Sequence, residues 1–395
     1  MKKEKETIIC VAMATWEGDY AKAVVHLMSA LGTFGNVLFV NYQFTWSDVF
    51  KKLLGIGEAP VSRMLGFESR IETSEENQSV FILTPPPVLP INWIKSKRLH
   101  GWLNQLNGVI VSRAIKRACR KLGLSTDLMI NAYNPTLGVP LLGKLDVRKT
   151  YYYCYDEISQ SKWCKKHGPR YESLFVAEVD AVFASSKALV KKLADENEKV
   201  TWIPSGVDFE LFNQAFEKPT MAKTEQRVCF IGSLDFRVDF DLLYFLVNAL
   251  PKVQFDLVGR IVEARQVKRF ETLPNVKIHG PHKPKDLPGF LSDASVGIIP
   301  FVKNEFTRNI YPLKINEYLA AGLPVVASDF ADLLEFSHVI SCASSDQEFL
   351  HALTNALKET DPGARLTRNQ LAFQNSWQSR AQMLYNYHLY ADTAS

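Results

Sequence analysis

Apolar, β-branched runs alternate with segments of helical periodicity along the whole chain. Several runs are uninterrupted apolar stretches, which is typical of parallel strands buried on both faces. The helical segments between them indicate repeated βαβ units. Thirteen strands are more than one open sheet usually holds, so two doubly wound sheets are expected. The predicted strands are residues 8–13, 37–41, 79–84, 128–132, 149–155, 181–184, 200–203, 228–231, 254–258, 276–279, 296–299, 324–327 and 339–341.

A break in this pattern predicts the domain boundary. Residues 206–224 follow a predicted strand and contain Pro219 and a polar stretch before the next strand begins. We therefore expect an N-terminal domain over 1–205 and a C-terminal domain over 206–373. Apolar residues at helical spacing predict a terminal helix within 374–395 that packs on the core.

Composition and charge exclude several classes of protein. The chain has 395 residues and a net charge of +4, which is too small to indicate nucleic acid binding by itself. None of its six cysteines forms a C-x-x-C pair, so neither a zinc site nor a disulfide framework is indicated, and a reduced cytosolic location is expected. No stretch of about 20 apolar residues indicates a membrane span. The short apolar run 8–14 is interpreted as a first buried strand, not as a signal peptide.

The segment 309–329 carries the most informative chemistry. A Pro-containing loop leads Lys314 and Glu317 into the start of a predicted helix that ends at Gly322. A helix N-terminus and a lysine both attract phosphate, and a carboxylate one turn later can accept both hydroxyls of a ribose. The strand that follows places the helix at the carboxyl edge of a parallel sheet, where open α/β folds bind ligands. An ordinary surface Lys/Glu pair is the alternative, but the surrounding pattern favours a nucleotide-sugar site.

Several motifs together resemble those of GT-B glycosyltransferases, especially the family 4-like group. Residues 309–329 resemble the donor-binding element of that family, in which a Glu-x7-Glu motif precedes Ala-x-Gly-x-Pro-Val-Val. Further segments resemble the family's element after the interdomain strand, the glycine turn of its C-terminal domain, its next strands and its last helix. These segments are residues 204–208 with Phe212, 230–234, 255–259, 276–280, 287–300 and 376–377. The resemblance is good over about 200–390 and loose over 1–200.

The resemblance implies a GT-B fold, with two Rossmann-like domains facing a central cleft and the last helix crossing back to the N-terminal domain. It implies a nucleotide-diphosphate sugar, expected to be a UDP-sugar, in the C-terminal domain. Asn309 stands where the family has its first Glu, and Arg237 is the nearest substitute for the family's Arg and Lys after the glycine turn. A similarity to the inverting xanthan glucuronosyltransferase type is also present. The donor-binding residues expected on this basis are Gly232, Ser233, Leu234, Arg237, Gly259, Phe301, Thr307, Asn309, Tyr311, Pro312, Leu313, Lys314 and Glu317.

Adjacent carboxylates follow the predicted strand 149–155. Asp156 matches the position of the base in the inverting relatives, and a carboxylate there could take the proton of an acceptor hydroxyl. Glu157 is the second candidate, and a solvated loop acid or a helix cap is the alternative for both. Inverting and retaining chemistry both stay open. After the first strand, Trp16, Gly18 and Asp19 are expected to bind the acceptor, with a plain turn as the alternative.

A basic stretch with interleaved tryptophans covers residues 91–125. It fits an anionic membrane surface. Nucleic acid is a rival partner, but no nucleic-acid motif supports it, and a solvated helix face is the remaining alternative. Residues 51–67, with Leu53, Leu54, Ile56, Met64 and Leu65, are a second candidate for a surface-seeking segment.

Taken together, the sequence predicts a metal-independent glycosyltransferase that needs no cofactor besides its nucleotide-sugar donor. None of the eight histidines has metal-ligand spacing to another. The expected acceptor is lipid-linked or a growing envelope polysaccharide, and the expected location is cytoplasmic, peripheral on the inner face of the cell membrane. A nucleotide-sugar epimerase of the same fold and a non-catalytic GT-B-like scaffold remain the alternatives.

Overall fold

The chain divides into two compact units. The computed structural model describes residues 5–18, 22–159, 164–218 and 225–393. The first unit comprises Met1–Pro204 and Ala381–Ser395, and the second comprises Ser205–Arg380. The chain thus passes from one unit to the other after Pro204, close to the expected boundary at 205, and again within the last helix, α16 (Trp377–Thr393).

The first unit is built on an eight-stranded sheet of order β3-β4-β2-β1-β5-β6-β7-β8. All neighbours are parallel except β3 and β4, which are antiparallel. The strands are β1 (Thr7–Ala12), β2 (Asn36–Val40), β3 (Ile71–Thr73), β4 (Val80–Leu83), β5 (Leu128–Ala132), β6 (Lys149–Cys154), β7 (Ala181–Ala184) and β8 (Val200–Trp202).

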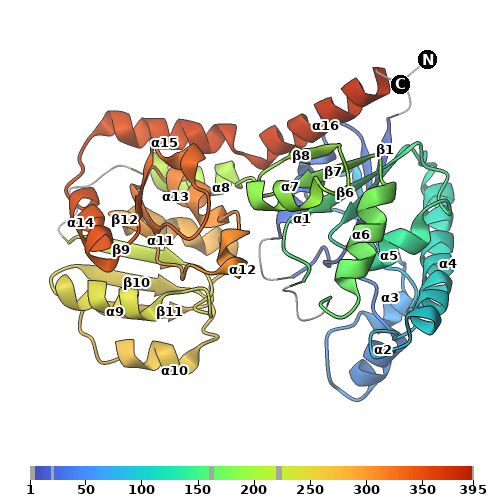
Figure 1. Cartoon of the computed structure of the whole chain (residues 1–395), viewed down its shortest axis with the longest axis horizontal. Coiled ribbons are helices and arrows are strands. Elements are labelled where there is room, and N and C mark those ends of the chain that lie inside the picture. The colour runs from blue at the N-terminus through green and yellow to red at the C-terminus, as the bar shows by residue number, and fades with distance from the viewer. Residues whose placement is uncertain (1–4, 19–21, 160–163, 219–224, 394–395) are drawn as a thin grey trace. The chain divides into compact units, whose positions relative to one another are not determined.

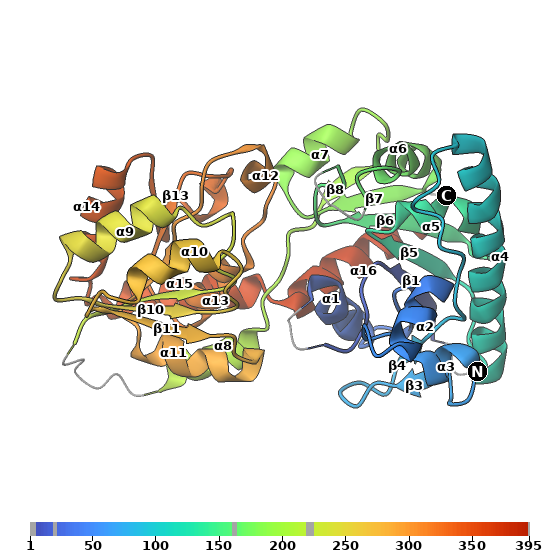
Figure 2. The ribbon, with the colours of Figure 1, turned by 90° about the horizontal axis from the view of Figure 1, so that it is seen from below.

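Helices cover both faces of this sheet. The alternation along β6 shows how: Tyr152 points into the core beneath α4, α5 and α6, whereas Tyr151 contacts His388 of α16 on the opposite face. The long helix α4 runs alongside α5 (Figures 1 and 2). The helices of this unit, besides α16, are α1 (Ala23–Leu31), α2 (Trp46–Leu53), α3 (Val61–Leu65), α4 (Lys97–Leu122), α5 (Pro135–Leu141), α6 (Gly168–Glu178) and α7 (Lys187–Leu193).

The second unit is built on a six-stranded, fully parallel sheet of order β11-β10-β9-β12-β13-β14. Helices α9, α10 and α14 cover one face, and α8, α11, α13 and α15 cover the other (Figure 1). The strands are β9 (Arg227–Ile231), β10 (Gln254–Val258), β11 (Val276–Gly280), β12 (Val296–Ile299), β13 (Val325–Ser328) and β14 (Ile340–Ala343). The helices are α8 (Phe209–Glu217), α9 (Phe240–Ala249), α10 (Ala264–Val267), α11 (Leu287–Asp293), α12 (Glu305–Arg308), α13 (Leu313–Ala320), α14 (Asp346–Ala356) and α15 (Pro362–Gln374), with short 3₁₀ turns at Lys268–Phe270, Pro284–Asp286 and Leu334–Phe336.

All thirteen predicted strands are present, with ends shifted by one or two residues. The prediction missed β3, because this three-residue edge strand has no fully buried side chain and so leaves no apolar run in the sequence. Both sheets have the doubly wound order in which the first strand of the unit has neighbours on both sides. Ligands of such folds bind where the strand order reverses, outside the carboxyl ends of the strands. In the second unit this switch point lies between β9 and β12.

A buried tyrosine fills the gap at this switch point. The strands β9 and β12 pair only through Val228 with Val296 and Cys229 with Gly297. Beyond these pairs β9 and β12 separate, and the hydroxyl of Tyr318 on α13 bonds to the backbone of both strands. It accepts a hydrogen bond from Ile231 N (2.9 Å) and donates one to Ile298 O (3.3 Å). A side chain at Gly297 would overlap the Tyr318 ring, so α13 rests directly on the sheet.

The other end of α13 is fixed by α15. The last carbonyl groups of a helix lack partners within it and must be satisfied from elsewhere. Here Asn369 donates its side-chain amide to Ala320 O (2.6 Å), and the buried Arg368 donates Nε to Gly322 O (3.1 Å). The positive charge of Arg368 also suits the negative end of the helix dipole. Both ends of α13 are therefore held in place.

We predict that Tyr318→Phe destabilises the second unit by about 1–3 kcal/mol, because Ile231 N and Ile298 O lose their buried partner while the ring packing is kept. Chemical denaturation of the whole chain measures this loss. The matched control is Tyr244→Phe on α9, whose ring is partly exposed. A loss no larger than that of the control would contradict the role given to the Tyr318 hydroxyl.

Candidate functional site

Two glycine turns lie side by side at the carboxyl ends of β9 and β10. Gly232 and Gly259 both have left-handed backbone conformations, with φ of 134° and 152°. A Cβ atom on Gly259 would overlap the carbonyl group of Gly232, and a Cβ atom on Gly232 would overlap the side chain of Lys314. Only glycine therefore fits at either position. The backbone of the turns can approach a ligand closely at this point.

Backbone hydrogen bonds join the loops after β9, β10 and β12 into one cradle. Leu234 N donates to Arg260 O (2.9 Å), which ties the first two loops together. Val302 N donates to Arg237 O (2.8 Å), which ties the loop after β9 to the loop after β12. Leu234 and Phe301 are buried in this cradle, whereas Ser233 and Arg237 remain partly accessible.

Lys314 enters the cradle from the first turn of α13. Its Nζ lies 5.8 Å from the ring centre of Phe230 and 5.3 Å from that of Phe301. Burial, and then the neighbouring Arg237 guanidinium, lower the pKa of Lys314 to about 8, against the opposing effects of Glu317 and Asp235. A cation kept in poor solvation is well placed to bind an anion.

Arg237 is a second cation in the cradle, but it already has a partner. Its guanidinium donates two hydrogen bonds to the buried Asp235, from Nε (2.9 Å) and from Nη2 (2.7 Å). The guanidinium also lies 5.6 Å from the ring centre of Phe301. Of the two cations, Lys314 is therefore the one that is better able to bind an anion.

Glu317 lies one helical turn after Lys314 and is also destabilised in its charged form. Burial raises the pKa of its carboxyl to about 7, and the negative Asp208 at the start of α8 adds to this effect, while Lys314 opposes it. The helix begins after Pro312, which provides no side-chain cap for the first N–H groups of α13. The site thus combines uncapped N–H donors, an amine and a carboxyl group at the switch point of the sheet (Figure 1).

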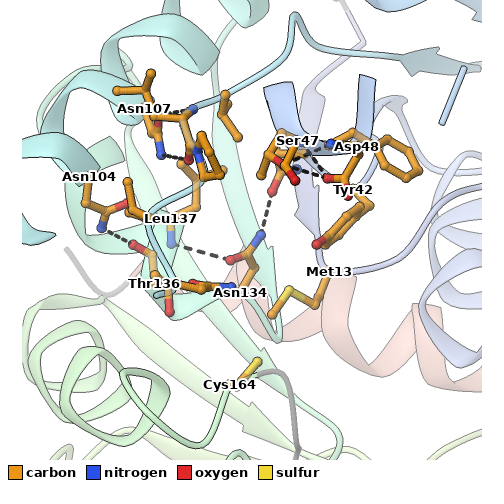
Figure 3. A pocket seen from close by; sticks show the side chains of 18 of the residues that line it. Met13, Tyr42, Ser47, Asp48, Asn104, Asn107, Asn134, Thr136, Leu137 and Cys164 are labelled. Atoms are coloured by element: carbon orange, nitrogen blue, oxygen red, sulfur yellow. Dashed lines mark hydrogen bonds between the residues drawn. The ribbon is translucent and has the colours of Figure 1, made fainter. Parts of the chain in front are cut away.

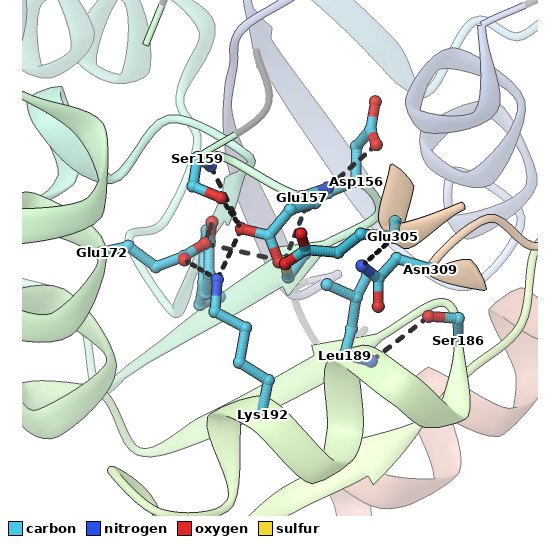
Figure 4. Close-up of polar contacts among 11 residues, drawn as sticks. Asp156, Glu157, Ser159, Glu172, Ser186, Leu189, Lys192, Glu305 and Asn309 are labelled. Atoms are coloured by element: carbon cyan, nitrogen blue, oxygen red, sulfur yellow. Dashed lines mark hydrogen bonds and ion pairs between the residues drawn. The ribbon is translucent and has the colours of Figure 1, made fainter. Parts of the chain in front are cut away.

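Three of the expected donor-binding residues hold the loop in place through their polar atoms. Thr307 is fully buried, and its hydroxyl donates to Val302 O (2.6 Å). Asn309 donates its amide to Glu305 O (2.9 Å; Figure 4). The hydroxyl of Tyr311 accepts a hydrogen bond from Asn316 (3.1 Å). These contacts shape the approach to α13.

Four residues of this site were not among those predicted from the sequence. Phe230 is the last ring before the glycine turn, and Asp235 pairs with Arg237. Asp208 perturbs Glu317 from α8, and Tyr318 fixes α13 to the sheet. Asp208, Phe230 and Tyr318 lie within the motifs 204–208, 230–234 and 309–329, so their positions could have suggested a role; nothing in the sequence indicates Asp235.

In the first unit, Asp156 and Glu157 follow β6 but differ in environment. Asp156 is partly accessible, and its Oδ1 accepts the backbone N–H of Glu157 (2.9 Å). Glu157 is buried, and its Oε1 accepts hydrogen bonds from Lys192 Nζ (2.7 Å) and from the hydroxyl of Ser159 (2.8 Å; Figure 4). Burial alone raises the pKa of Glu157, but these hydrogen bonds outweigh it and hold the pKa below its usual value. Asp156 is therefore the better placed of the two to exchange a proton.

The predicted acceptor residues lie after β1. The ring of Trp16 packs edge-on against Phe39 at 5.0 Å between ring centres, and its backbone N–H donates to Asn41 (2.7 Å). Gly18 has a φ of 138°, and a Cβ atom there would lie 2.9 Å from the amine of Lys22. Asp19 lies outside the described residues. These contacts shape the turn, and the structure places a larger opening beside it.

That opening is a cavity of about 790 Å³ outside the carboxyl ends of β1, β2 and β5 (Figure 3). Amide side chains of its lining bond to each other or to the backbone: Asn134 donates to Gln43 Oε1 (2.7 Å), and Asn104 donates to Thr136 O (2.6 Å). Apolar walls surround these amides, and the strand switch point of this unit, between β1 and β5, lies beside them. Trp16 and Gly18 are not part of the cavity's lining, which includes Met13, Thr15, Tyr42, Asp48, Leu137 and Cys164.

Two general features bear on metals and membranes. Among residues 5–18, 22–159, 164–218 and 225–393, no group of three or more His, Cys, Asp or Glu side chains could hold a metal ion. Within the same ranges, no helix is long and apolar enough to cross a membrane. In the basic stretch 91–125, Trp93 and Trp102 are exposed, and Lys116 pairs with Asp146 at 3.1 Å.

Two parallel, doubly wound sheets in one chain define the GT-B class of fold, and solved structures agree. Sucrose-phosphate synthase from Thermosynechococcus elongatus superposes with a TM-score of 0.69 at 17% identity over 99% of this chain and 100% of that one. Anabaena HepE in complex with UDP and glucose superposes with a TM-score of 0.62 at 14% identity, over 97% and 99%. At these identities the likeness is one of fold.

Sequence comparison gives a narrower match. Residues 225–359 match the family model described as glycosyl transferases group 1. TuaH of Bacillus subtilis (strain 168), by name a teichuronic acid biosynthesis glycosyltransferase, is 27% identical over 231 residues, which are 55% of this chain. The match spans 58% of that protein's length.

We predict that Glu317→Gln stabilises the chain more at pH 7.5 than at pH 5. The folded-state pKa of about 7 lies above the ordinary value of 4.5, so the wild-type chain loses stability as the pH rises from 4.5 to 7. Glutamine cannot ionise and escapes this loss. The difference in unfolding free energy between variant and wild type should grow by about 2 kcal/mol between the two pH values. Urea denaturation at each pH measures it.

The control for this experiment is Glu271→Gln, on an exposed carboxylate of the same unit. Its unfolding free energy relative to wild type should change little between pH 5 and pH 7.5. An equal pH response in the two variants would mean that Glu317 is not held in the environment described above.

Proposed function

We propose that the protein is a glycosyltransferase that moves a sugar from a UDP-sugar to a hydroxyl group of a lipid-linked or envelope-polysaccharide acceptor. The observation that carries this proposal is the start of α13. An uncapped helix N-terminus, Lys314 and Glu317 meet at the switch point of the second unit, where a diphosphate and a ribose would find matching partners.

The comparisons support the class of reaction and the donor. The matched family segment, 225–359, contains β9 to β14 and the whole of α13. One structural relative was solved with UDP and glucose, and TuaH is named for teichuronic acid synthesis, which concerns an envelope polysaccharide. We carry the UDP-sugar donor and the envelope acceptor to this chain on that basis.

The proposed reaction is a displacement at the anomeric carbon of the donor sugar. The acceptor oxygen forms a bond to this carbon while the bond to the diphosphate breaks, and the nucleoside diphosphate leaves with the electron pair. The acceptor oxygen attacks on the face opposite the diphosphate, which makes the displacement inverting, and Asp156 takes the proton of the acceptor hydroxyl. The amine of Lys314 and the N–H groups of α13 stabilise the charge on the leaving diphosphate, so the scheme needs no metal ion.

The same scheme gives roles to the remaining residues. Gly232, Gly259 and the loop to Arg237 bring backbone close to the diphosphate, and Glu317 accepts the ribose hydroxyls. Asn309 replaces the carboxylate of the common pattern, so we assign to it the preference among donor sugars. The basic stretch 91–125 supports a peripheral location on the anionic inner face of the cell membrane, where a lipid-linked acceptor would lie.

We predict that Lys314→Met removes the stabilisation that a UDP-sugar gives to the wild-type chain. A donor at 100 times its dissociation constant should add about 2.7 kcal/mol to the wild-type stability. Thermal unfolding with a panel of UDP-, GDP- and dTDP-sugars measures the effect, with Lys303→Met, an exposed lysine of the same unit, as control. The affinity of the wild-type chain for the UDP-sugar should also fall by up to about tenfold per pH unit above pH 8, since Lys314 then loses its proton.

The outcomes of this panel separate the alternatives. If no nucleotide-sugar stabilises the wild-type chain, the protein is interpreted as a non-catalytic scaffold and not as an enzyme. If a donor alone is converted into a different nucleotide-sugar, the epimerase replaces the transferase.

We predict that Asp156→Asn lowers the rate of sugar transfer at least about 100-fold, because the amide cannot accept the acceptor proton. Donor binding should stay as in wild type, since the carboxylate lies in the other unit. Release of UDP in the presence of a membrane extract that contains acceptor measures the rate. The control is Asp195→Asn, on an exposed carboxylate of the first unit. Near-wild-type transfer by the Asp156 variant would exclude it as the base.

A further inference from the structure

The exposed end of α2 is the largest apolar feature of the first unit that the proposed reaction leaves unexplained. Residues 50–58 are all exposed. Four of them are large apolar residues, with 62% of Phe50, 69% of Leu53, 77% of Leu54 and 63% of Ile56 open to solvent. We call these four side chains the α2 tip. Apolar groups gathered in this way usually mark a surface that binds a partner or a membrane.

The backbone holds the α2 tip in a fixed, protruding shape. The helix begins with a capping box between Thr45 and Asp48, and after its last turn Ile56 N donates back to Lys51 O (2.8 Å). Gly55 and Gly57 have φ of 79° and 93°, and a Cβ atom on either would meet no other atom within 4 Å. The tip therefore projects away from the rest of its unit.

A small core beneath α2 and α3 supports this shape. Val49, Ala59 and Met64 form it, so Met64 is buried although the sequence suggested a surface-seeking role for it. Leu53, Leu54 and Ile56, by contrast, are exposed as that interpretation requires. The apolar residues of the α2 tip are thus held outward while their neighbours pack inward.

Charge and size both favour a lipid bilayer as the occupant. Lys51 and Lys52 lie among the apolar side chains, and Glu58 is the single acidic residue in the sequence from 50 to 67. Apolar side chains interleaved with lysines suit an anionic membrane surface. Four protruding side chains also fall short of the roughly 800 Å² that each partner buries in a stable protein interface.

The α2 tip adjoins the cavity of the first unit. Ser47, Asp48 and Lys51 of α2 line that cavity (Figure 3), and so does Trp93, which is 75% exposed. We propose that the α2 tip inserts into an anionic lipid bilayer. The cavity then receives the head group of a lipid-linked acceptor, while the lipid stays in the bilayer. This second part rests on the proposed function.

Vesicle flotation of the whole chain tests the insertion without donor or acceptor, so its outcome is independent of catalysis. The wild-type chain should bind vesicles of phosphatidylcholine and phosphatidylglycerol at 3:1 and bind pure phosphatidylcholine far less. The variant Leu53→Ser/Leu54→Ser/Ile56→Ser should bind the mixed vesicles at least about tenfold more weakly. Lys51→Gln and Lys52→Gln should each weaken binding roughly fivefold, with the effect fading at high salt.

Two matched variants make the result specific. Leu174→Ser/Leu334→Ser/Leu366→Ser removes three exposed leucines elsewhere and should bind like wild type. Arg113→Gln/Arg117→Gln/Arg120→Gln removes exposed charge from α4 and should cost less binding than the change at the α2 tip. Cooperative thermal unfolding near the wild-type temperature, without any ligand, shows that each variant is folded.

Three results would overturn the proposal. The first is wild-type vesicle binding by the variant of the α2 tip. The second is a loss confined to the α4 variant, which would keep the membrane contact of the proposed function but assign it to another surface. The third is an absence of vesicle binding combined with a dimer, seen by light scattering, that dissociates when the α2 tip is changed.

Discussion

The second unit of this protein depends on one hydroxyl group, at the point where two of its strands separate. Parallel neighbours normally satisfy each other's backbone, but β9 and β12 separate after two residue pairs. The Tyr318 hydroxyl serves one N–H and one C=O of the separated strands. This contact gives both backbone groups a partner where the two strands no longer pair. It also sets the height and rotation of α13, and with them the positions of Lys314 and Glu317.

The electrostatics around Lys314 and Glu317 fit a ligand-binding site. Burial lowers the pKa of Lys314 and raises that of Glu317, so each charge is less stable than it would be in water. A structural ion pair would instead reinforce both charges, as Lys192 does for the low pKa of Glu157. A diphosphate near Lys314 and hydroxyl donors near Glu317 would supply what each group lacks. The perturbed values therefore point to binding more than to stability.

Local sequence signals account for most of the fold and for part of the site. Apolar runs gave the thirteen parallel strands, and the pattern around Gly322 placed Lys314 and Glu317 in the first half of α13. The sequence could not reveal partners brought together by folding. Lys192, 35 residues after Glu157, pairs with that carboxylate, and nothing in the local sequence indicates this contact. The hydroxyl of Thr307 likewise bonds within its own loop, where it completes a capping box. No single residue type in the sequence predicts this capping box.

The same strand order leads to different surroundings at the switch points of the two units. In the first unit β1 and β5 stay paired through five residues, up to Ala12 and Ala132, so no side chain has to fill a gap between them. The space arises instead from the loops beyond, where Tyr133 takes a left-handed conformation with φ of 57° and Asn134 caps α5. Its walls are largely apolar, and amide side chains such as those of Asn134 and Asn104 already have partners. Such a surface offers shape and apolar contact with few fixed charges, whereas the start of α13 presents an amine, a carboxyl group and uncapped N–H donors. The proposed function requires this difference, because an amphipathic acceptor needs apolar contact and a nucleotide needs charged and polar partners.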